Sequence, residues 1–144
     1  MKPKEFVDQL DDGKIVAAIA EAERKTSGEV RVYVSHRQRE DALVAAKARF
    51  AKLGMARTRH RNAVLIYFAP LTHKFALWGD VEVHKKCGEE FWQEIAGRMA
   101  AALKNGRFTE AVVLAVQSVG EVLARHFPRD PDDKDELPNK VERD

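Results

Sequence analysis

Three oxygen-bearing side chains, Asn62, Asp80 and Glu82, lie at the outer ends of two strongly apolar segments. The first segment reads RNAVLIYFAP and the second HKFALWGD, so a hairpin between them brings Asn62 beside the end of its partner strand. Two carboxylates and an amide oxygen are ligands that suit a hard cation such as calcium. The pattern therefore predicts a weak divalent-cation site formed by Asn62, Asp80 and Glu82.

Asp80 also has a purely structural interpretation. A short acidic side chain ahead of a helix accepts hydrogen bonds from free backbone N–H groups and complements the helix dipole. The sequence Gly79-Asp80-Val81-Glu82 fits the start of such a helix. Both interpretations stay open at this point, because the sequence does not give the direction of the Asp80 side chain.

The five histidines and the single cysteine, Cys87, form no transition-metal motif. No HxxH, HxxxH or HExxH pair occurs, so no helix face presents two imidazoles to zinc. The glycine-rich GxGxxG and GxxxxGK[ST] loops that bind phosphates are also missing. We therefore expect no nucleotide, flavin or haem. The one cofactor that we expect is calcium or another divalent cation. Cys87 is expected to be a small buried hydrophobe.

The net charge of +2 is unevenly distributed along the chain. Residues 47–61 hold six basic residues and no acid, whereas residues 129–144 hold seven acids against four bases. The basic segment predicts an electrostatic surface for a protein partner, with the acidic tail as its internal competitor. Nucleic-acid binding is not expected, because stacking aromatics are not interleaved among the bases.

The apolar segments are too short for a membrane protein. The longest, residues 63–71, has nine residues, about half of what a helix needs to cross a bilayer. The N-terminal MKPKEFVDQLDDGK lacks the apolar core of a secretory signal, and one cysteine excludes an internal disulfide. We expect no membrane insertion and a cytoplasmic location.

Hydrophobic periodicity predicts the elements that position the candidate site. Helical spacing predicts helices over residues 3–25, 41–53 and 83–104 and a last helix from Thr109, with Leu43 of the second helix facing the core. Alternation and continuous apolar segments predict strands over residues 30–34, 63–69 and 74–78. The order of elements is α-β-α-β-β-α-α.

This order predicts the fold class. A right-handed crossover makes the strands at 30–34 and 63–69 parallel, and the hairpin adds residues 74–78 antiparallel. The apolar central strand needs cover on both sides, so we expect an α/β protein with a mixed sheet and helices on both faces, an α/β/α sandwich. Residues 1–128 are expected to form a single domain, with residues 129–144 as an acidic tail packed on it.

The ordered motifs TSGEVRVYV, RNAVLIYFAP, HKFALWGD, CGEEFW and HFPRDPDDKDELPN resemble the TPM domain family, and most of all its soluble bacterial branch. That family was long catalogued as a domain of unknown function. The resemblance implies an α/β sandwich, the acid phosphatase activity ascribed to the plant thylakoid-lumen relative, and calcium binding in some members. Asn62 matches the asparagine that opens the family's central strand, and Asp80 matches its Gly-Asp. Arg61 stands where many members have an acid.

Three hypotheses for the function follow. The first is a binding module with a weak calcium site at Asn62, Asp80 and Glu82. The second is a metal-dependent phosphomonoesterase, in which the ion and Asp80 orient a water molecule for attack on phosphate. The third is an electrostatic protein-binding module that uses residues 47–61.

Overall fold

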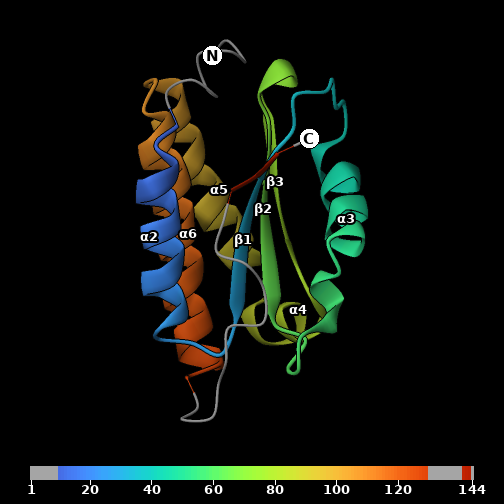
Figure 1. Cartoon of the computed structure of the whole chain (residues 1–144), viewed down its shortest axis with the longest axis vertical. Helices are drawn as coiled ribbons and strands as arrows, with labels where there is room; N and C mark the ends of the chain where they lie inside the picture. Colours follow the sequence, from blue (N-terminus) through green and yellow to red (C-terminus); the bar gives the residue numbers. More distant parts are fainter. Residues whose placement is uncertain (1–9, 130–140, 144) are drawn as a thin grey trace.

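The computed structural model describes residues 10–129 and 141–143 (Figure 1). Its helices are α2 (Asp12–Glu23), α3 (Ala42–Lys52), α4 (Val81–Cys87), α5 (Glu89–Lys104) and α6 (Phe108–His126). Its strands are β1 (Glu29–Val34), β2 (Ala63–Ala69), β3 (Lys74–Gly79) and β4 (Val141–Arg143). Single 3-10 turns at Met55–Arg57 and Pro70–Thr72 precede β2 and close the β2–β3 hairpin.

The four strands form one mixed sheet in the order β3-β2-β1-β4. Strand β1 pairs parallel with β2, and β2 pairs antiparallel with β3, with Val64 opposite Gly79. Both predicted pairings are confirmed. Strand β4 was not predicted; it comes from the acidic tail and pairs parallel with β1.

Helices cover both faces of the sheet, which confirms the α/β/α sandwich. Helices α2, α5 and α6 pack on one face, and α3 packs on the other (Figure 1). Every residue of β2 is buried, because this central strand has a helical layer on each side. The continuous apolar sequence of β2 is the local cause of this position.

The alternating strand β1 is also buried along its whole length. The charged side chain of Arg31 and the backbone of Val30 have polar side chains as partners instead of water. The guanidinium of Arg31 donates a hydrogen bond to Glu142 on β4, and the backbone N–H of Val30 donates to the buried Glu23 at 3.0 Å. The short fourth strand therefore satisfies a charge that the sheet buries.

The predicted single helix over residues 83–104 is wrong, because the structure has two helices there. Helix α4 ends and α5 begins at Gly88, whose backbone has φ 75° and ψ 176°. That conformation is open to glycine and strained for any residue with a Cβ atom. The two helices bury Val83 and then Phe91, Ile95 and Met99 in the same apolar core.

The inward orientation predicted for Leu43 is also wrong. Helix α3 turns Ala42, Ala46 and Phe50 to the sheet, whereas Leu43 is 44% exposed. Helix α2 begins at Asp12, where the side chain of Asp11 accepts a hydrogen bond from the N–H of Lys14 at 3.1 Å.

Some expectations fall outside the described residues. They are the helix over residues 3–9 and the packing of residues 130–140 of the tail. Within the described part of the chain, no helix has the length and apolar character needed to cross a membrane.

Candidate functional site

Asp80 lies where β3 ends and α4 begins, beside the first residue of β2. Its backbone N–H donates to the carbonyl of Ala63 at 2.9 Å. Its carboxylate accepts a hydrogen bond from the N–H of Val81 at 2.7 Å, so Asp80 is the N-cap of α4. The capping role considered from the sequence is therefore present in the structure.

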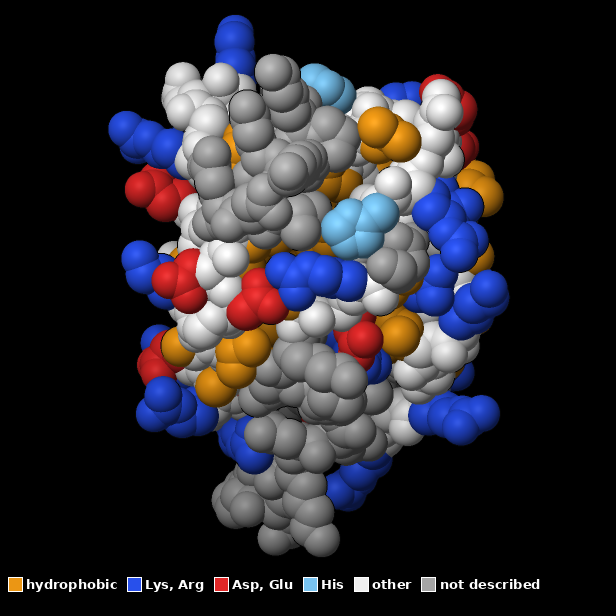
Figure 2. Space-filling view, turned by 45° about the horizontal axis from the view of Figure 1, so that its top comes forward, with side chains coloured by type: hydrophobic (Ala, Val, Ile, Leu, Met, Phe, Trp, Pro, Cys, Tyr) orange, Lys and Arg blue, Asp and Glu red, His pale blue; other side chains and the backbone are white. Residues whose placement is uncertain are grey.

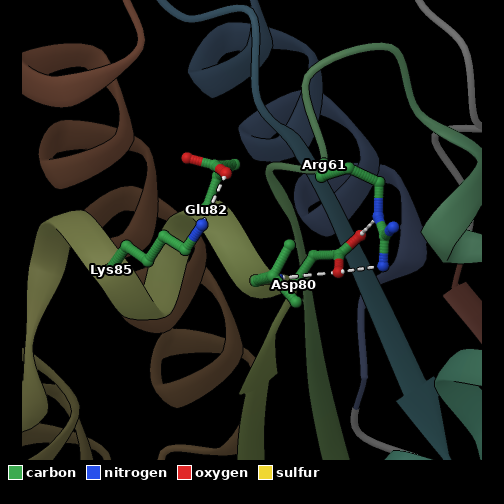
Figure 3. A network of polar contacts seen from close by, with 5 residues as sticks. Arg61, Asp80, Glu82 and Lys85 are labelled. Carbon is green, nitrogen blue, oxygen red and sulfur yellow. Dashed lines mark hydrogen bonds and ion pairs between the residues drawn. The ribbon is translucent and has the colours of Figure 1, made fainter.

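The same carboxylate forms a bidentate ion pair with Arg61 (Figure 3). Nε of Arg61 lies 2.7 Å from Oδ2 of Asp80, and Nη2 lies 2.8 Å from Oδ1. Asp80 is only 4% exposed, whereas the side chain of Arg61 is 47% exposed. The hydrogen bonds to Asp80 raise the pKa of the Arg61 guanidinium above its ordinary value, so the arginine stays charged.

Arg61 has an unusual backbone for this position. Its φ is 51°, in the left-handed region that a residue other than glycine seldom adopts. This conformation immediately precedes Asn62 and β2, where the chain turns into the central strand. The ion pair with Asp80 and the hydrogen bond from the N–H of Glu82 to the carbonyl of Arg61 hold it from both ends.

Asn62 is 1% exposed and points its amide group at a different partner. Its Nδ2 donates to Oγ of Ser27 at 3.1 Å, which joins the start of β2 to the turn before β1. Its Oδ1 is buried and has no hydrogen-bond partner among the described residues. A buried acceptor without a partner is costly, so this oxygen is available to a ligand.

Glu82 extends from the first turn of α4, away from the carboxylate of Asp80 (Figure 3). Its Oε1 lies 3.4 Å from Nζ of Lys85, one turn along the helix. The backbones of the three predicted ligands thus lie close together in space, but their side chains do not point to a common centre. Within residues 10–129 and 141–143, no group of three or more His, Cys, Asp or Glu side chains is placed to hold a metal.

These donors suit a divalent cation in chemical type but not in their present orientation. Carboxylates and an amide oxygen are the ligands that calcium takes. Asp80 has both oxygens on Arg61, and Glu82 faces Lys85. A cation at Asp80 therefore has to compete with the guanidinium of Arg61.

Arg61 is the residue of the candidate site that sequence reasoning missed. It was interpreted as one of the six bases of residues 47–61 and as the replacement of an acid. The signal was available, because a hairpin that brings Asn62 beside the end of β3 also brings the preceding arginine beside Asp80. Opposite charges at facing ends of two antiparallel strands attract each other.

The basic segment 47–61 is less free than its composition suggested. Lys47 lies over the ring of Trp78, 4.5 Å from the centroid, and Arg49 lies over Tyr33 at 4.6 Å. With Arg61 on Asp80, three of these bases are packed on the protein. Figure 2 still shows Lys and Arg side chains along the side of the molecule that carries α3. This side presents a basic surface.

A groove beside β3 is a second feature that the sequence did not reveal. It has a volume of about 460 Å³ and lies between Leu43 of α3, the strand, and Trp92 of α5. The ring of His84 lies between the two tryptophans, 4.7 Å from Trp78 and 5.8 Å from Trp92. The exposure of Leu43 follows from its place in the wall of this groove.

Comparisons with known proteins agree with this fold. A model of the TPM domain matches residues 2–122. Among solved structures, the chain is similar to the NMR structure of BA42 protein from the psychrophilic bacterium Bizionia argentinensis. The two are 33% identical with a TM-score of 0.87, over 94% of this chain and 96% of that one. No curated protein sequence matches the chain.

Proposed function

The chain belongs to the TPM domain family, and on that basis we propose that it is a binding module in which Asp80 binds a divalent cation such as calcium weakly. Asn62 and Glu82 supply the further oxygens. When the ion is absent, the guanidinium of Arg61 forms an ion pair with the carboxylate of Asp80. Calcium and Arg61 are therefore competitors for one buried acid.

A single observation carries this proposal: the buried carboxylate of Asp80 is neutralised by a side chain that is half exposed. A buried charge needs a partner, because leaving it unpaired is strongly unfavourable. The exposed guanidinium can move into water, where it is well solvated, and a cation then takes its place. The competition explains why the binding is weak.

Calcium titration of the isotope-labelled protein, followed by its amide NMR spectrum, tests the proposal. We expect shifts centred on Asn62, Asp80 and Glu82. The variant Arg61→Gln removes the competitor, so it should bind calcium more tightly than the wild-type protein. The exposed Arg57→Gln variant loses the same charge without touching Asp80 and should bind like the wild type. Thermal unfolding establishes that each variant is folded.

Two results would defeat the cation site. The first is an Arg61→Gln protein whose spectrum is insensitive to calcium at the end of β3. The second is a set of shifts confined to residues 129–144. A gain in affinity that is equal in Arg61→Gln and Arg57→Gln would show a general effect of net charge, and it would also count against the site.

The phosphomonoesterase hypothesis depends on the same ion, so it is tested after the titration. Hydrolysis of p-nitrophenyl phosphate should require calcium or another divalent cation and should disappear in Asp80→Asn. Turnover that Asp80→Asn leaves unchanged would come from another site or from a contaminant.

A further inference from the structure

The groove beside β3 runs along the outer edge of the strand. Phe75 and Leu77 line the groove and lie on the face of the sheet that packs against the layer of α5. Ala76 and Trp78 also line it and lie on the opposite face, which packs against α3. Successive side chains of a strand point to opposite faces. A pocket that touches both sets therefore lies on the edge of the strand, with backbone at its base.

Within the described part of the chain, no strand pairs with the backbone groups at this edge. The N–H of Asp80 points inward to Ala63 on β2, so the alternation of an antiparallel ladder also points Trp78 and Ala76 inward. The N–H and C=O groups of Phe75 and Leu77 then point outward. Strand β3 is the end of the sheet in the described part of the chain, and no described strand pairs with this edge.

The edge carries little protection against pairing. Natural edge strands are usually blocked by proline, by a bulge or by charged side chains that point outward. Strand β3, with the sequence KFALWG, has no proline, and its pairing with β2 is continuous from Lys74 to Gly79. Its only charged residue, Lys74, is at the first position. An apolar groove around an unprotected edge is suited to an added strand.

We propose that the outer edge of β3 binds an extended acidic segment of another protein as an additional strand of the sheet. Bases lie at both ends of the site: Lys47 is held over Trp78, and Lys74 is the first residue of the strand, with its ammonium 3.9 Å from the exposed carboxylate of Glu40. The acid Glu89 also lines the groove. Apolar side chains of the bound segment would fill the space between Leu43 and Trp92, and its acidic side chains would face Lys47 and Lys74.

The same charges disfavour a second copy of this chain as the occupant. Antiparallel pairing of two β3 strands places Lys74 of each copy near the Trp78 end of the other. Lys47 is held at that end, so each lysine would face a lysine. Like charges across an interface are repulsive, whereas an acidic segment is attracted.

A blocked eight-residue peptide in which valine and glutamate alternate is the probe for this site. It is titrated into the labelled protein in the presence of EDTA, which keeps the test independent of any cation. We expect NMR shifts in β3 and α3 and slower hydrogen exchange at the N–H groups of Phe75 and Leu77. The same peptide methylated on alternate backbone nitrogens cannot pair with a strand edge and should lose this binding. A peptide with lysine in place of glutamate should lose it too.

Variants of α3 separate the site from general charge effects. Lys47→Glu should weaken binding of the glutamate peptide about fivefold, the size of one exposed ion pair. Lys52→Glu makes the same change at the exposed end of the same helix and should have a much smaller effect. Chemical denaturation establishes that both variants are folded.

Three outcomes would overturn the proposal. One is the absence of peptide-induced shifts and protection at Phe75 and Leu77. Another is equal binding by the N-methylated peptide, because that binding would not use the strand edge. The third is sedimentation of the free protein as a dimer with the same two amides protected, since the occupant would then be a second copy.

Discussion

Arg61 and Asp80 join the two ends of the β2–β3 hairpin through two parallel hydrogen bonds of 2.7 and 2.8 Å. The same carboxylate caps α4 through the N–H of Val81. One buried acid therefore fixes three segments: the turn into β2, the end of β3 and the first turn of α4. Any ligand that binds Asp80 has to act on all three.

Substitutions of Asp80 should separate its two structural roles. Asp80→Asn keeps an N-cap acceptor and removes the charge that Arg61 binds, whereas Asp80→Ala removes both. We expect both variants to unfold at lower urea concentration than the wild type. The alanine variant should be less stable than the asparagine variant by about 1 kcal/mol, the usual contribution of an N-cap. Equal free energies of unfolding for the two variants would mean that the cap contributes nothing.

The break between α4 and α5 should require glycine at position 88. Gly88 has φ 75° and ψ 176°, although a Cβ atom there would meet nothing within 4 Å. Gly88→Ala should therefore destabilise the protein by roughly 1–3 kcal/mol through backbone strain alone. Gly97, inside α5, also has open space around it, so Gly97→Ala should be stabilising by about 0.5–1 kcal/mol. Urea denaturation of the matched pair checks both signs, and a Gly88→Ala protein at least as stable as the wild type would contradict the strain at Gly88.

Helix α6 packs closely against α2 at Gly120, and this contact should leave no room for a side chain there. A Cβ atom there would lie 2.6 Å from Cβ of Ala22, closer than two carbons can approach. Gly120→Ala should lower the free energy of unfolding by roughly 1–3 kcal/mol, despite the better helix propensity of alanine. The double variant Gly120→Ala, Ala22→Gly restores the space and should recover part of the loss. A double variant with no recovery would place the cost elsewhere.

The attachment of β4 should weaken in acid. Arg143 donates hydrogen bonds to both oxygens of Asp12 at 2.7 and 2.8 Å, and these bonds lower the pKa of Asp12 below its ordinary value of 3.8. A lowered pKa in the folded protein means that the pair stabilises it fully above the ordinary value and is lost as the pH falls through the folded one. We therefore expect amide protection in β4 to decrease below about pH 4.

Substitution at either end of that pair provides the control. Asp12→Asn and Arg143→Gln should each weaken the protection of β4 at neutral pH and remove most of its dependence on acid. The partly exposed pair is worth about 0.5–1 kcal/mol, so the rest of the fold should persist. Loss of β4 protection at an unchanged pH in Asp12→Asn would show that another acid is responsible.

Cys87 should be a poor nucleophile at neutral pH. Burial raises the pKa of its thiol above the ordinary value of 9.0, and the nearby positive charge of Lys86 offsets only part of that increase. Because the thiolate is the reactive form, alkylation by iodoacetamide should be slow at pH 7 and should accelerate only in alkaline solution. The same thiol in urea should react like a free cysteine. Fast alkylation of the folded protein at pH 7 would contradict this environment.

The sequence by itself determined how β1, β2 and β3 are arranged in the sheet. The continuous apolar segment of β2 requires cover on both faces. The long helical crossover before β2 makes β1 its parallel neighbour, and the short hairpin after it makes β3 its antiparallel neighbour. These features are local, because periodicity and chain direction are properties of neighbouring residues. They were predicted for that reason.

Only the tertiary structure decided what the side chains at the site contact. The pairing of Arg61 with Asp80, the direction of Glu82, and the exposure of Leu43 depend on how separate segments are rotated against one another. The same holds for β4, which forms only because β1 presents an edge and a buried arginine to the tail. A charged side chain takes the nearest partner in space, and distance along the chain does not give that partner.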